Sequence, residues 1–143
     1  MLVTGGAGYI GSHAVLALHD AGHRPTVIDN LSAGRRSSVP ADVPLIVSDV
    51  GDARLMARVL AETRFDTIMH FAGSVVVPEP VADPLSYYGN NTAASRTLIE
   101  AAVNARVPRF IFSSTAAVYG IPECIPVTED TRPARSTPTA GRS

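Results

Sequence analysis

Three glycines stand three residues apart near the N-terminus, in the stretch MLVTGGAGYIGSH. Gly5, Gly8 and Gly11 follow a short apolar run and precede a segment with apolar residues at helical spacing. Between a strand and a helix, the first such glycine permits a tight turn, the second lets the backbone approach a pyrophosphate, and the third allows the helix to pack closely on the strand. The N–H groups that begin the helix favour anions. The stretch therefore predicts a dinucleotide-binding site.

An acidic residue completes this pattern. A dinucleotide site places a carboxylate roughly 20 positions after the glycines, where it accepts hydrogen bonds from the adenosine ribose. Asp29 occupies that position at the end of an apolar run. Because a carboxylate repels the 2′-phosphate of NADP, Asp29 favours NAD. Arg35 and Arg36 follow in a polar loop, and we interpret them as a solvated pair rather than as ligands of a 2′-phosphate.

The elements that must position these residues alternate along the chain. Apolar runs bounded by turn residues predict strands at 2–3, 24–29, 44–48, 65–73 and 109–114, and helical spacing predicts helices at 9–21, 52–63 and 87–104. Gly22 is expected to end the first helix, and Asp52 to cap the second. Such alternation implies parallel strands joined by helical crossovers. We expect an α/β fold, a Rossmann-like doubly wound parallel sheet truncated after about five strands.

Length and composition limit the domain count and the kinds of partner. The chain has 143 residues, which is one domain at most; we expect 1–130 to form an incomplete NAD-binding Rossmann domain and 131–143 an irregular tail. A net charge of -1 gives no basic surface for nucleic acid, and no run approaches the ~18 apolar residues of a membrane span. Cys124 is the only cysteine, which we interpret as an inert thiol of a cytoplasmic protein without a metal site.

Motifs spread over the chain resemble one family. TGGAGYIGSH, DNLS, SDV, HFAGSVVVPE, DPLSYYGNNT and FIFSSTAAVYG occur in this order. Together they resemble the N-terminal half of the UDP-glucose 4-epimerases, extended members of the short-chain dehydrogenase/reductase family, over residues 1 to about 131. Members of that family hold NAD permanently and use it to oxidise carbon 4 of a UDP-hexose, after which the keto sugar rotates and the hydride returns to its other face. The resemblance thus implies an isomerase of galactose metabolism that interconverts UDP-galactose and UDP-glucose.

The resemblance also assigns residues to the cofactor. They follow the predicted strands, where open α/β sheets bind their ligands. The implied contacts are Tyr9 and Ile10 with the pyrophosphate, Asp29, Asn30 and the loop after them with the adenosine ribose, Asp49 and Val50 with the adenine, Phe71, Ala72 and Gly73 beneath the cofactor, and Asn90 and Ser113 with its nicotinamide half. From spacing alone, a helix-cap or turn role explains Asp49 as well as cofactor binding does. Spacing alone favours packing in the core as the role of Phe71.

One hydroxyl is implied to act in catalysis. In the family, the residue at the position of Thr115, in SSTAAVYG, hydrogen-bonds the 4-hydroxyl of the sugar and helps pass its proton to a tyrosine. Related nucleotide-sugar 4,6-dehydratases have an Asp-Glu pair directly after this threonine, whereas Ala116 and Ala117 stand here, so dehydration lacks its acid and base. The tyrosine of the family is followed four residues later by a lysine, whose charge helps make the phenol a usable base. No tyrosine follows Tyr119, and the chain contains no lysine.

A frameshift would explain the missing pair. A reading such as TPTRPINPYGRSKL, written in GC-rich codons, becomes TRPARSTPTAGRS followed by a stop when one C is removed from its second codon, and that is the sequence of 131–143. The coding DNA tests this interpretation, because one base restored after Thr131 should bring Tyr and Lys into frame. We expect the fragment to be inactive alone, to expose an apolar sheet edge, and not to form the family's homodimer normally.

Two other functions fit the sequence. One is a different UDP-sugar 4-epimerase, acting for instance on N-acetylated sugars, because the residues that set specificity lie mostly in the half that the resemblance does not cover. The other is a catalytically silent module that senses or sequesters NAD. Turnover of UDP-galactose would favour an epimerase, whereas saturable NAD binding without turnover would favour the silent module.

Overall fold

The structure is a computed structural model that describes residues 1–73, 88–120, 122 and 124–133. It divides into two units, Met1–Phe112 and Ser113–Ser143. The first unit contains all the strands found in the described residues. In the second unit, the described residues form one 3-10 turn, η3 (Ala116–Tyr119), and the thiol of Cys124 is exposed. The boundary that we expected near residue 130 stays a prediction.

The first unit is a five-stranded parallel sheet with helices on both faces. Its strands and helices, in chain order, are β1 (Leu2–Thr4), α1 (Tyr9–Asp20), β2 (Thr26–Asp29), η1 (Arg36–Ser38), β3 (Leu45–Val47), α2 (Ala53–Glu62), β4 (Thr67–His70), η2 (Gly89–Ala93), α4 (Ala94–Asn104) and β5 (Arg109–Phe112). The strands lie in the order β3-β2-β1-β4-β5. The expected doubly wound, Rossmann-like parallel sheet is therefore confirmed, and β1 lies at its centre.

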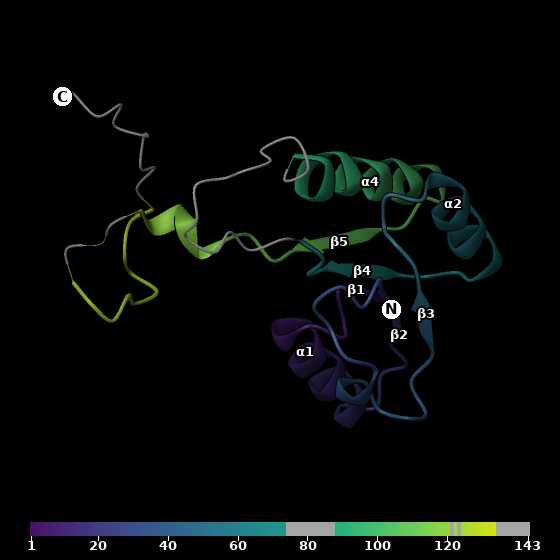
Figure 1. The fold of residues 1–143 in the computed structure, drawn as a ribbon, viewed down its shortest axis with the longest axis horizontal. Coiled ribbons are helices and arrows are strands. Elements are labelled where there is room, and N and C mark those ends of the chain that lie inside the picture. The colour runs from purple at the N-terminus through teal and green to yellow at the C-terminus, as the bar shows by residue number, and fades with distance from the viewer. Residues whose placement is uncertain (74–87, 121, 123, 134–143) are drawn as a thin grey trace. The chain divides into compact units, whose positions relative to one another are not determined.

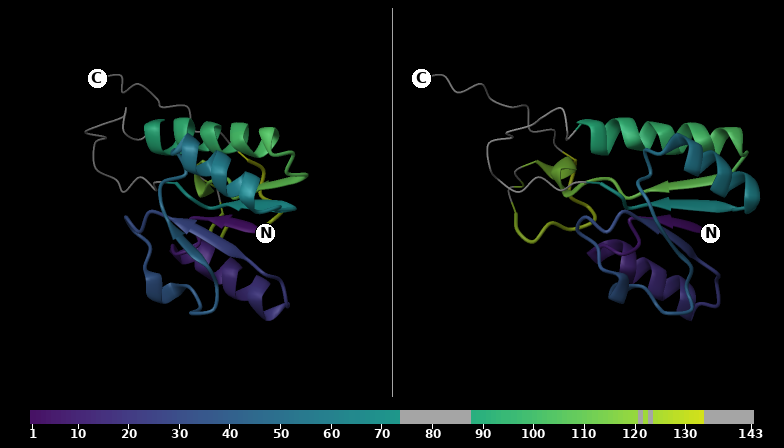
Figure 2. Two further views of the ribbon diagram at one scale, coloured as in Figure 1. Left: turned by 90° about the vertical axis from the view of Figure 1, so that its right-hand side faces the viewer. Right: turned by 45° about the vertical axis from the view of Figure 1, so that its right-hand side comes forward.

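The two faces of the sheet carry separate cores. Figures 1 and 2 show α1 on one face and α2 with α4 on the other. Alternate residues of each strand point to opposite faces. Leu2, Ile28 and Ile68 pack with Met56 of α2 and Leu98 of α4. The intervening strand residues Val3 and Val27 face α1 and pack with its Val15. Because both faces are covered, β1 and β2 consist of apolar runs rather than an apolar and polar alternation.

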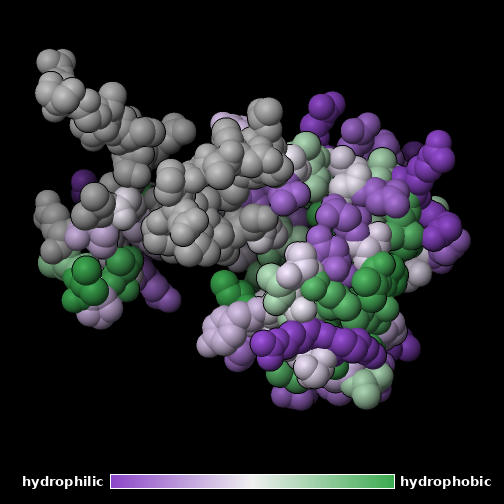
Figure 3. All heavy atoms as spheres, in the orientation of Figure 1, coloured by the Kyte–Doolittle hydropathy of each residue, from purple (hydrophilic) through white to green (hydrophobic). Residues whose placement is uncertain are grey.

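The helix α2 illustrates how local sequence sets an element. Asp52 caps it, as expected, because its carboxylate accepts hydrogen bonds from the N–H groups of Arg54 and Leu55 at 3.1 and 3.0 Å. Met56, Val59 and Leu60 lie on one side of the helix and are buried. Each of these side chains contributes roughly 1.5–3 kcal/mol through burial. In the space-filling view, hydrophilic side chains gather over the outer surface of this helix (Figure 3).

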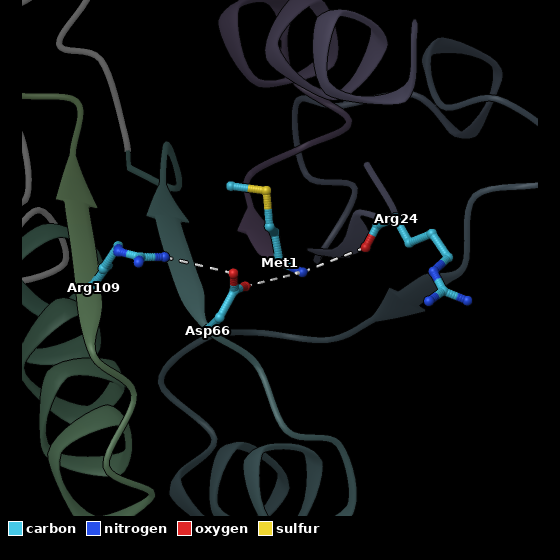
Figure 4. Close-up of polar contacts among 4 residues, drawn as sticks. All are labelled: Met1, Arg24, Asp66 and Arg109. Atoms are coloured by element: carbon cyan, nitrogen blue, oxygen red, sulfur yellow. Dashed lines mark hydrogen bonds and ion pairs between the residues drawn. The ribbon is translucent and has the colours of Figure 1, made fainter. Parts of the chain in front are cut away.

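Charged groups connect the amino ends of the central strands. The ammonium group at Met1 lies 3.8 Å from a carboxylate oxygen of Asp66 and donates to the Arg24 carbonyl at 3.4 Å, and Asp66 also lies 3.7 Å from the Arg109 guanidinium (Figure 4). Asp66 and Arg109 are well exposed, so water and salt weaken these pairs to about 0–1 kcal/mol each. The backbone bond from the Thr26 N–H to the Met1 carbonyl, at 2.9 Å, ties the same ends together.

Two elements begin later than the sequence indicated. The second strand starts at Thr26 rather than at residue 24, because Pro25 has no N–H to donate to a neighbouring strand. The long helix expected over 87–104 is interrupted: Tyr88 is α-helical, Gly89–Ala93 form a π-helical turn in which the Ala94 N–H donates to the Gly89 carbonyl, and α4 begins only at Ala94. Gly, Asn and Thr in this turn are weak α-helix formers, which favours the wider turn. Residue 87 lies outside the described residues.

The helices α1 and α4 end with the same backbone geometry but different residues. After α1, Gly22 adopts φ +79°, and its N–H and that of His23 donate to carbonyls in the last turn. After α4, Arg106 adopts φ +55° with the equivalent pair of bonds, completed by the N–H of Val107. This is the Schellman arrangement, which favours glycine at the left-handed position. Gly22 therefore ends α1 as expected, whereas Arg106 carries steric strain.

We predict opposite stability changes at these two helix ends. Arg106→Gly should raise the free energy of unfolding by about 1 kcal/mol because it relieves the left-handed strain, and Gly22→Ala should lower it by about 1 kcal/mol. Urea unfolding followed by circular dichroism measures both changes. Arg106→Ala is the matched control, because alanine keeps the strain and should not stabilise; a gain from alanine equal to that from glycine would contradict the strain argument.

Candidate functional site

A pocket opens at the carboxyl edge of the sheet, where the order of strands changes direction along the chain. Strands β2 and β3 lie on one side of β1, and β4 and β5 lie on its other side. Open α/β sheets bind ligands at the position where the strand order reverses in this way. Its lining comes from the segments that follow β1, β2, β3 and β4 and from η2, and consists of Gly5, Gly8, Ile28, Asp29, Asn30, Ser32, Ala33, Gly34, Ser48, Asp49, Val50, Phe71, Ala72, Gly73 and Asn90.

The glycine turn between β1 and α1 is built from close backbone contacts. Gly5 adopts φ +70°, and a Cβ there would lie 2.5 Å from the backbone nitrogen of Ala72. A Cβ on Gly11 would overlap the Gly5 carbonyl oxygen, so Gly11 packs against the turn itself. The sequence had suggested close packing of the helix on the strand instead. Both positions exclude any side chain for structural reasons.

Gly8 differs from its neighbours in the turn. A Cβ at this position would meet only the Gly5 carbonyl oxygen, at 3.3 Å, and its φ of -75° suits any residue. It precedes Tyr9, the first residue of α1, and no side chain caps this helix. The first N–H groups of an α-helix have no intrahelical partners. Gly8 therefore leaves the pocket open beside N–H groups that suit an anion.

Asp29 joins the glycine turn to the loop after β2. It is 8% exposed, and its two carboxylate oxygens accept the N–H of Ala7 at 2.9 Å and the N–H of Leu31 at 2.8 Å. Leu31 adopts φ +58°, which is rare for a leucine. The sequence predicted a ribose ligand at Asp29. The structure adds a second role, in which this carboxylate fixes two segments of the pocket wall.

Asp49 holds the loops that follow β2 and β3. One carboxylate oxygen accepts the N–H of Gly51 at 2.7 Å, and the other accepts the side-chain amide of Asn30 at 3.1 Å. The helix cap of α2 is Asp52, so Asp49 is a turn residue that also lines the pocket. The interpretation as a turn residue is therefore confirmed, whereas the contact of Asp49 with adenine stays a prediction.

The segment after β4 and the start of the last helix form the remaining wall. Phe71, Ala72 and Gly73 line the pocket. Phe71 also packs against the core that contains Val3, so it is both a pocket residue and a core residue. The position of a Cβ on Gly73 lies 3.3 Å from the side-chain oxygen of Asn91. Asn90 reaches the pocket from η2.

Several predicted contacts lie outside the pocket lining. Tyr9 and Ile10 start α1 and are 83% and 62% exposed, and neither is among the residues that line the pocket, so their contact with the pyrophosphate stays a prediction. Ser113 and Thr115 belong to the second unit, and their contacts with cofactor and substrate stay predictions. Within the described ranges, no group of three or more His, Cys, Asp or Glu residues is arranged to hold a metal ion. Among the described residues, no helix is long and apolar enough to cross a membrane.

The sequence analysis did not single out Gly34 or His70. A Cβ on Gly34 would lie 2.8 Å from the Ala7 carbonyl carbon, and the Arg35 N–H donates to the Ala7 carbonyl oxygen at 3.0 Å, so the loop after β2 packs on the glycine turn. The glycine in LSAG was the available signal for Gly34. His70 is the first residue of the motif HFAGSVVVPE, but a histidine inside an apolar strand has no spacing pattern that would assign it a role.

His70 is buried at the carboxyl end of β4 and is 1% exposed. Its Nδ1 lies 2.6 Å from the Thr4 hydroxyl, and its Nε2 lies 2.7 Å from the Ser95 hydroxyl. The rings of Phe110 and Phe112 lie beside it, with centroids at 6.0 and 5.8 Å. Burial lowers the pKa of His70, because the charged imidazolium loses its hydration there.

This arrangement defines a class of protein. A parallel sheet in the order β3-β2-β1-β4-β5, a glycine turn at the start of α1 and an acidic residue after β2 are the features of a Rossmann-type dinucleotide-binding domain. The comparison with family models gives the particular family. The chain belongs to the NAD dependent epimerase/dehydratase family, whose model matches residues 1–140.

Individual relatives confirm the resemblance to the N-terminal part of UDP-glucose 4-epimerases. UDP-glucose 4-epimerase of Azospirillum brasilense is 58% identical over 130 residues, which are 91% of this chain and 37% of that protein. Probable UDP-arabinose 4-epimerase 3 of Arabidopsis thaliana is 42% identical over 92% of this chain and 34% of its own length. The crystal structure of UDP-glucose 4-epimerase from Bifidobacterium longum, in complex with NAD+ and UDP, superposes with a TM-score of 0.81 at 37% identity and covers 93% of this chain and 42% of that one. This chain thus spans less than half the length of these relatives.

Alanine at two positions of the glycine turn should separate folding from binding. Gly11→Ala should lower the free energy of unfolding by about 3 kcal/mol, because a backbone oxygen occupies the site of the new Cβ. Gly8→Ala should lower it by less than about 1 kcal/mol, because its Cβ would meet only the Gly5 carbonyl oxygen, at 3.3 Å, and a shift of a few tenths of an ångström relieves that contact. Thermal unfolding of the two variants measures the difference. Equal destabilisation would contradict the assignment of Gly8 to the open pocket.

Proposed function

We propose that this chain is the NAD-binding part of a UDP-hexose 4-epimerase. The observation that carries the proposal is the convergence of the glycine turn, Asp29 and Asp49 on one pocket at the carboxyl edge of the sheet. The NAD complex of the Bifidobacterium longum enzyme supports the choice of cofactor, because that enzyme shares the fold at 37% identity. Among UDP-sugars, UDP-glucose and UDP-galactose are the proposed substrates, supported by the Azospirillum brasilense relative.

The residues of the pocket fit a dinucleotide. The amides at the start of α1 would hold the pyrophosphate, and Gly8 leaves them accessible. Asp29 and Asp49 each use one lone pair per oxygen on the protein, and a carboxylate oxygen has a second lone pair for a ribose hydroxyl or the adenine amino group. No lysine or arginine is among the residues that line the pocket in the described part of the chain. The lining therefore favours the ribose of NAD over the 2′-phosphate of NADP.

The proposed reaction divides its requirements between this chain and other groups. NAD, when bound, supplies a reversible hydride acceptor for carbon 4 of the sugar. Thr115 would hydrogen-bond the hydroxyl on that carbon and orient its proton. A base must accept the proton, and the 143-residue sequence offers neither a tyrosine after Tyr119 nor any lysine to tune one. We therefore propose that the 143-residue chain binds NAD without epimerising a UDP-sugar.

The substrate and the assembly belong to the same proposal. The complex of the Bifidobacterium longum enzyme contains UDP, and the Arabidopsis thaliana relative is a probable UDP-arabinose epimerase, so these relatives share the UDP group and differ in the sugar. A UDP-sugar other than UDP-glucose is therefore the second candidate substrate. The family homodimer is not expected to form normally from this chain alone. A single cysteine in 143 residues accords with a reducing compartment such as the cytoplasm.

Calorimetric titration of the purified chain with NAD, together with a turnover assay on UDP-galactose, tests the proposal. We expect saturable binding of one NAD per chain and no turnover. Binding accompanied by turnover would contradict the proposal that the chain binds NAD without catalysis, but it would support the assignment as an epimerase. Absence of NAD binding by a chain that unfolds cooperatively would overturn the proposed function. Gly8→Ala should weaken binding because its Cβ enters the space proposed for the pyrophosphate, while leaving the unfolding transition nearly unchanged.

Asp29 should set the preference for NAD over NADP. Asp29→Asn removes the negative charge proposed to face the 2′ position of the adenosine ribose. The dissociation constant for NADP divided by that for NAD should therefore fall by about tenfold. The variant should also unfold more easily, because one amide oxygen cannot accept from both Ala7 and Leu31. Comparing two cofactors on the same variant separates these effects. Asp20→Asn, the same change on an exposed carboxylate of α1, should leave the ratio unaltered.

A further inference from the structure

Thr4, His70 and Ser95 form a hydrogen-bonded chain that joins β1, β4 and α4 directly behind the pocket wall. We propose that neutral His70 is a positioning residue for the dinucleotide: it holds the glycine turn, the segment after β4 and the start of the last helix at the spacing NAD requires, so that a proton on His70 and NAD in the pocket exclude each other. The inference rests on the NAD-binding function proposed above, and it adds a pH-dependent control of that site.

The first link fixes the two segments that meet at the bottom of the pocket. Thr4 directly precedes Gly5, and His70 directly precedes Phe71. The Phe71 N–H donates to the Thr4 carbonyl at 2.9 Å, and a Cβ on Gly5 would lie 2.5 Å from the nitrogen of Ala72. The side-chain bond between Thr4 and His70, at 2.6 Å, therefore lies one residue behind a contact with no spare room. A shift of the imidazole moves both backbone segments that line the pocket.

The second link fixes the start of the last helix. Ser95, bonded to His70 at 2.7 Å, is the second residue after the π-helical turn Gly89–Ala93, and Asn90 of that turn lines the pocket. A π-helical turn is a single irregular turn, and such turns frequently occur at functional sites. The bond to Ser95 therefore ties the start of α4, next to this turn, to β4. Through it the imidazole connects the helix that follows Asn90 with the glycine turn.

The surroundings of His70 favour its neutral form. Thr4 from β1, Phe110 and Phe112 from β5 and Ser95 from α4 contact its ring, and none of them is ionisable. The charged residues on α4 and β5, namely Arg96, Glu100 and Arg109, are all exposed, and none has a described contact with the ring. Protonation would make both ring nitrogens donors, so both hydroxyls would have to accept, and the charge would have no counter-ion. The protonated ring is accommodated only if the packing around it moves.

The experiment is a titration of the full chain with NAD at a series of pH values from 8 to 5.5. Binding by the unaltered chain should be strongest at pH 8 and weaken as the pH falls below the ordinary histidine pKa of 6.5, because the buried ring resists the proton that the opened form takes up. His70→Gln should bind at pH 8 and lose this dependence, since an amide donates and accepts but does not ionise. The variant retains His13, His19 and His23, so any pH dependence that they cause is present in both proteins and cancels in the comparison.

Variants of the two hydroxyls test the geometry at a fixed pH of 8. Thr4→Val and Ser95→Ala should each weaken NAD binding by about fivefold, the effect of one lost hydrogen bond. The matched controls are Thr67→Val, a buried threonine at the other end of β4, and Ser37→Ala, an exposed serine of η1 that is not among the residues lining the pocket; both should bind as the unaltered chain does. Thermal unfolding of all four variants shows that each is folded at the temperature of the titration.

The outcomes distinguish this inference from the function on which it rests. If the unaltered chain binds NAD but Thr4→Val and Ser95→Ala bind equally well, or His70→Gln keeps the same pH dependence, the positioning role is overturned and the NAD site stands. If the unaltered chain binds no NAD at any pH, both are overturned. Histidine NMR gives a further readout: addition of NAD should lower the pKa of His70.

Discussion

The contact between the turn after β1 and the segment after β4 is the constraint on which the site depends. Backbone meets backbone there, since a Cβ on Gly5 would overlap Ala72 and one on Gly11 would overlap the Gly5 carbonyl. This packing leaves no side chain between the central strands and the pocket, so the pocket reaches down to main-chain atoms. A pyrophosphate can use main-chain amides only where such an approach is open. Gly8 lies between these closely packed glycines, yet a Cβ there would meet only the Gly5 carbonyl oxygen.

Carboxylates give this glycine turn its walls. Asp29 accepts hydrogen bonds from the turn and from the loop after β2, and Asp49 accepts from the loops after β2 and β3, so two acidic side chains order three backbone segments. A carboxylate that accepts hydrogen bonds from several N–H groups is held in one orientation without a cation. The pocket is therefore negative by construction on the side proposed for adenosine. Uncharged hydroxyls of a ribose suit such a wall, and a further phosphate does not.

The sequence predicted the sheet and most of the pocket because those features depend on local patterns. The glycine spacing, the apolar runs and Asp29 are readable along the chain, and they place the carboxyl ends of parallel strands together. The π-helical turn was missed because weak helix formers in Gly89–Ala93 only lower helix propensity, and the choice of a wider turn depends on packing. His70 was missed for a different reason: its partners, Thr4 and Ser95, are distant in sequence, and only the fold brings them to one ring. The second role of Asp29 likewise required coordinates.

The central position of β1 has a consequence for how the chain acquires its structure. Thr4 and His70 are separated by 66 residues, and β1 pairs with β2 on one side and β4 on the other. A strand of three residues gains little from one neighbour, so its second neighbour must be synthesised and docked before the glycine turn is held. Contacts of such long range slow folding, because the entropy of closing the loop is lost before the contact is made. The most recognisable motif, although translated first, is thus among the last parts of this unit to become ordered.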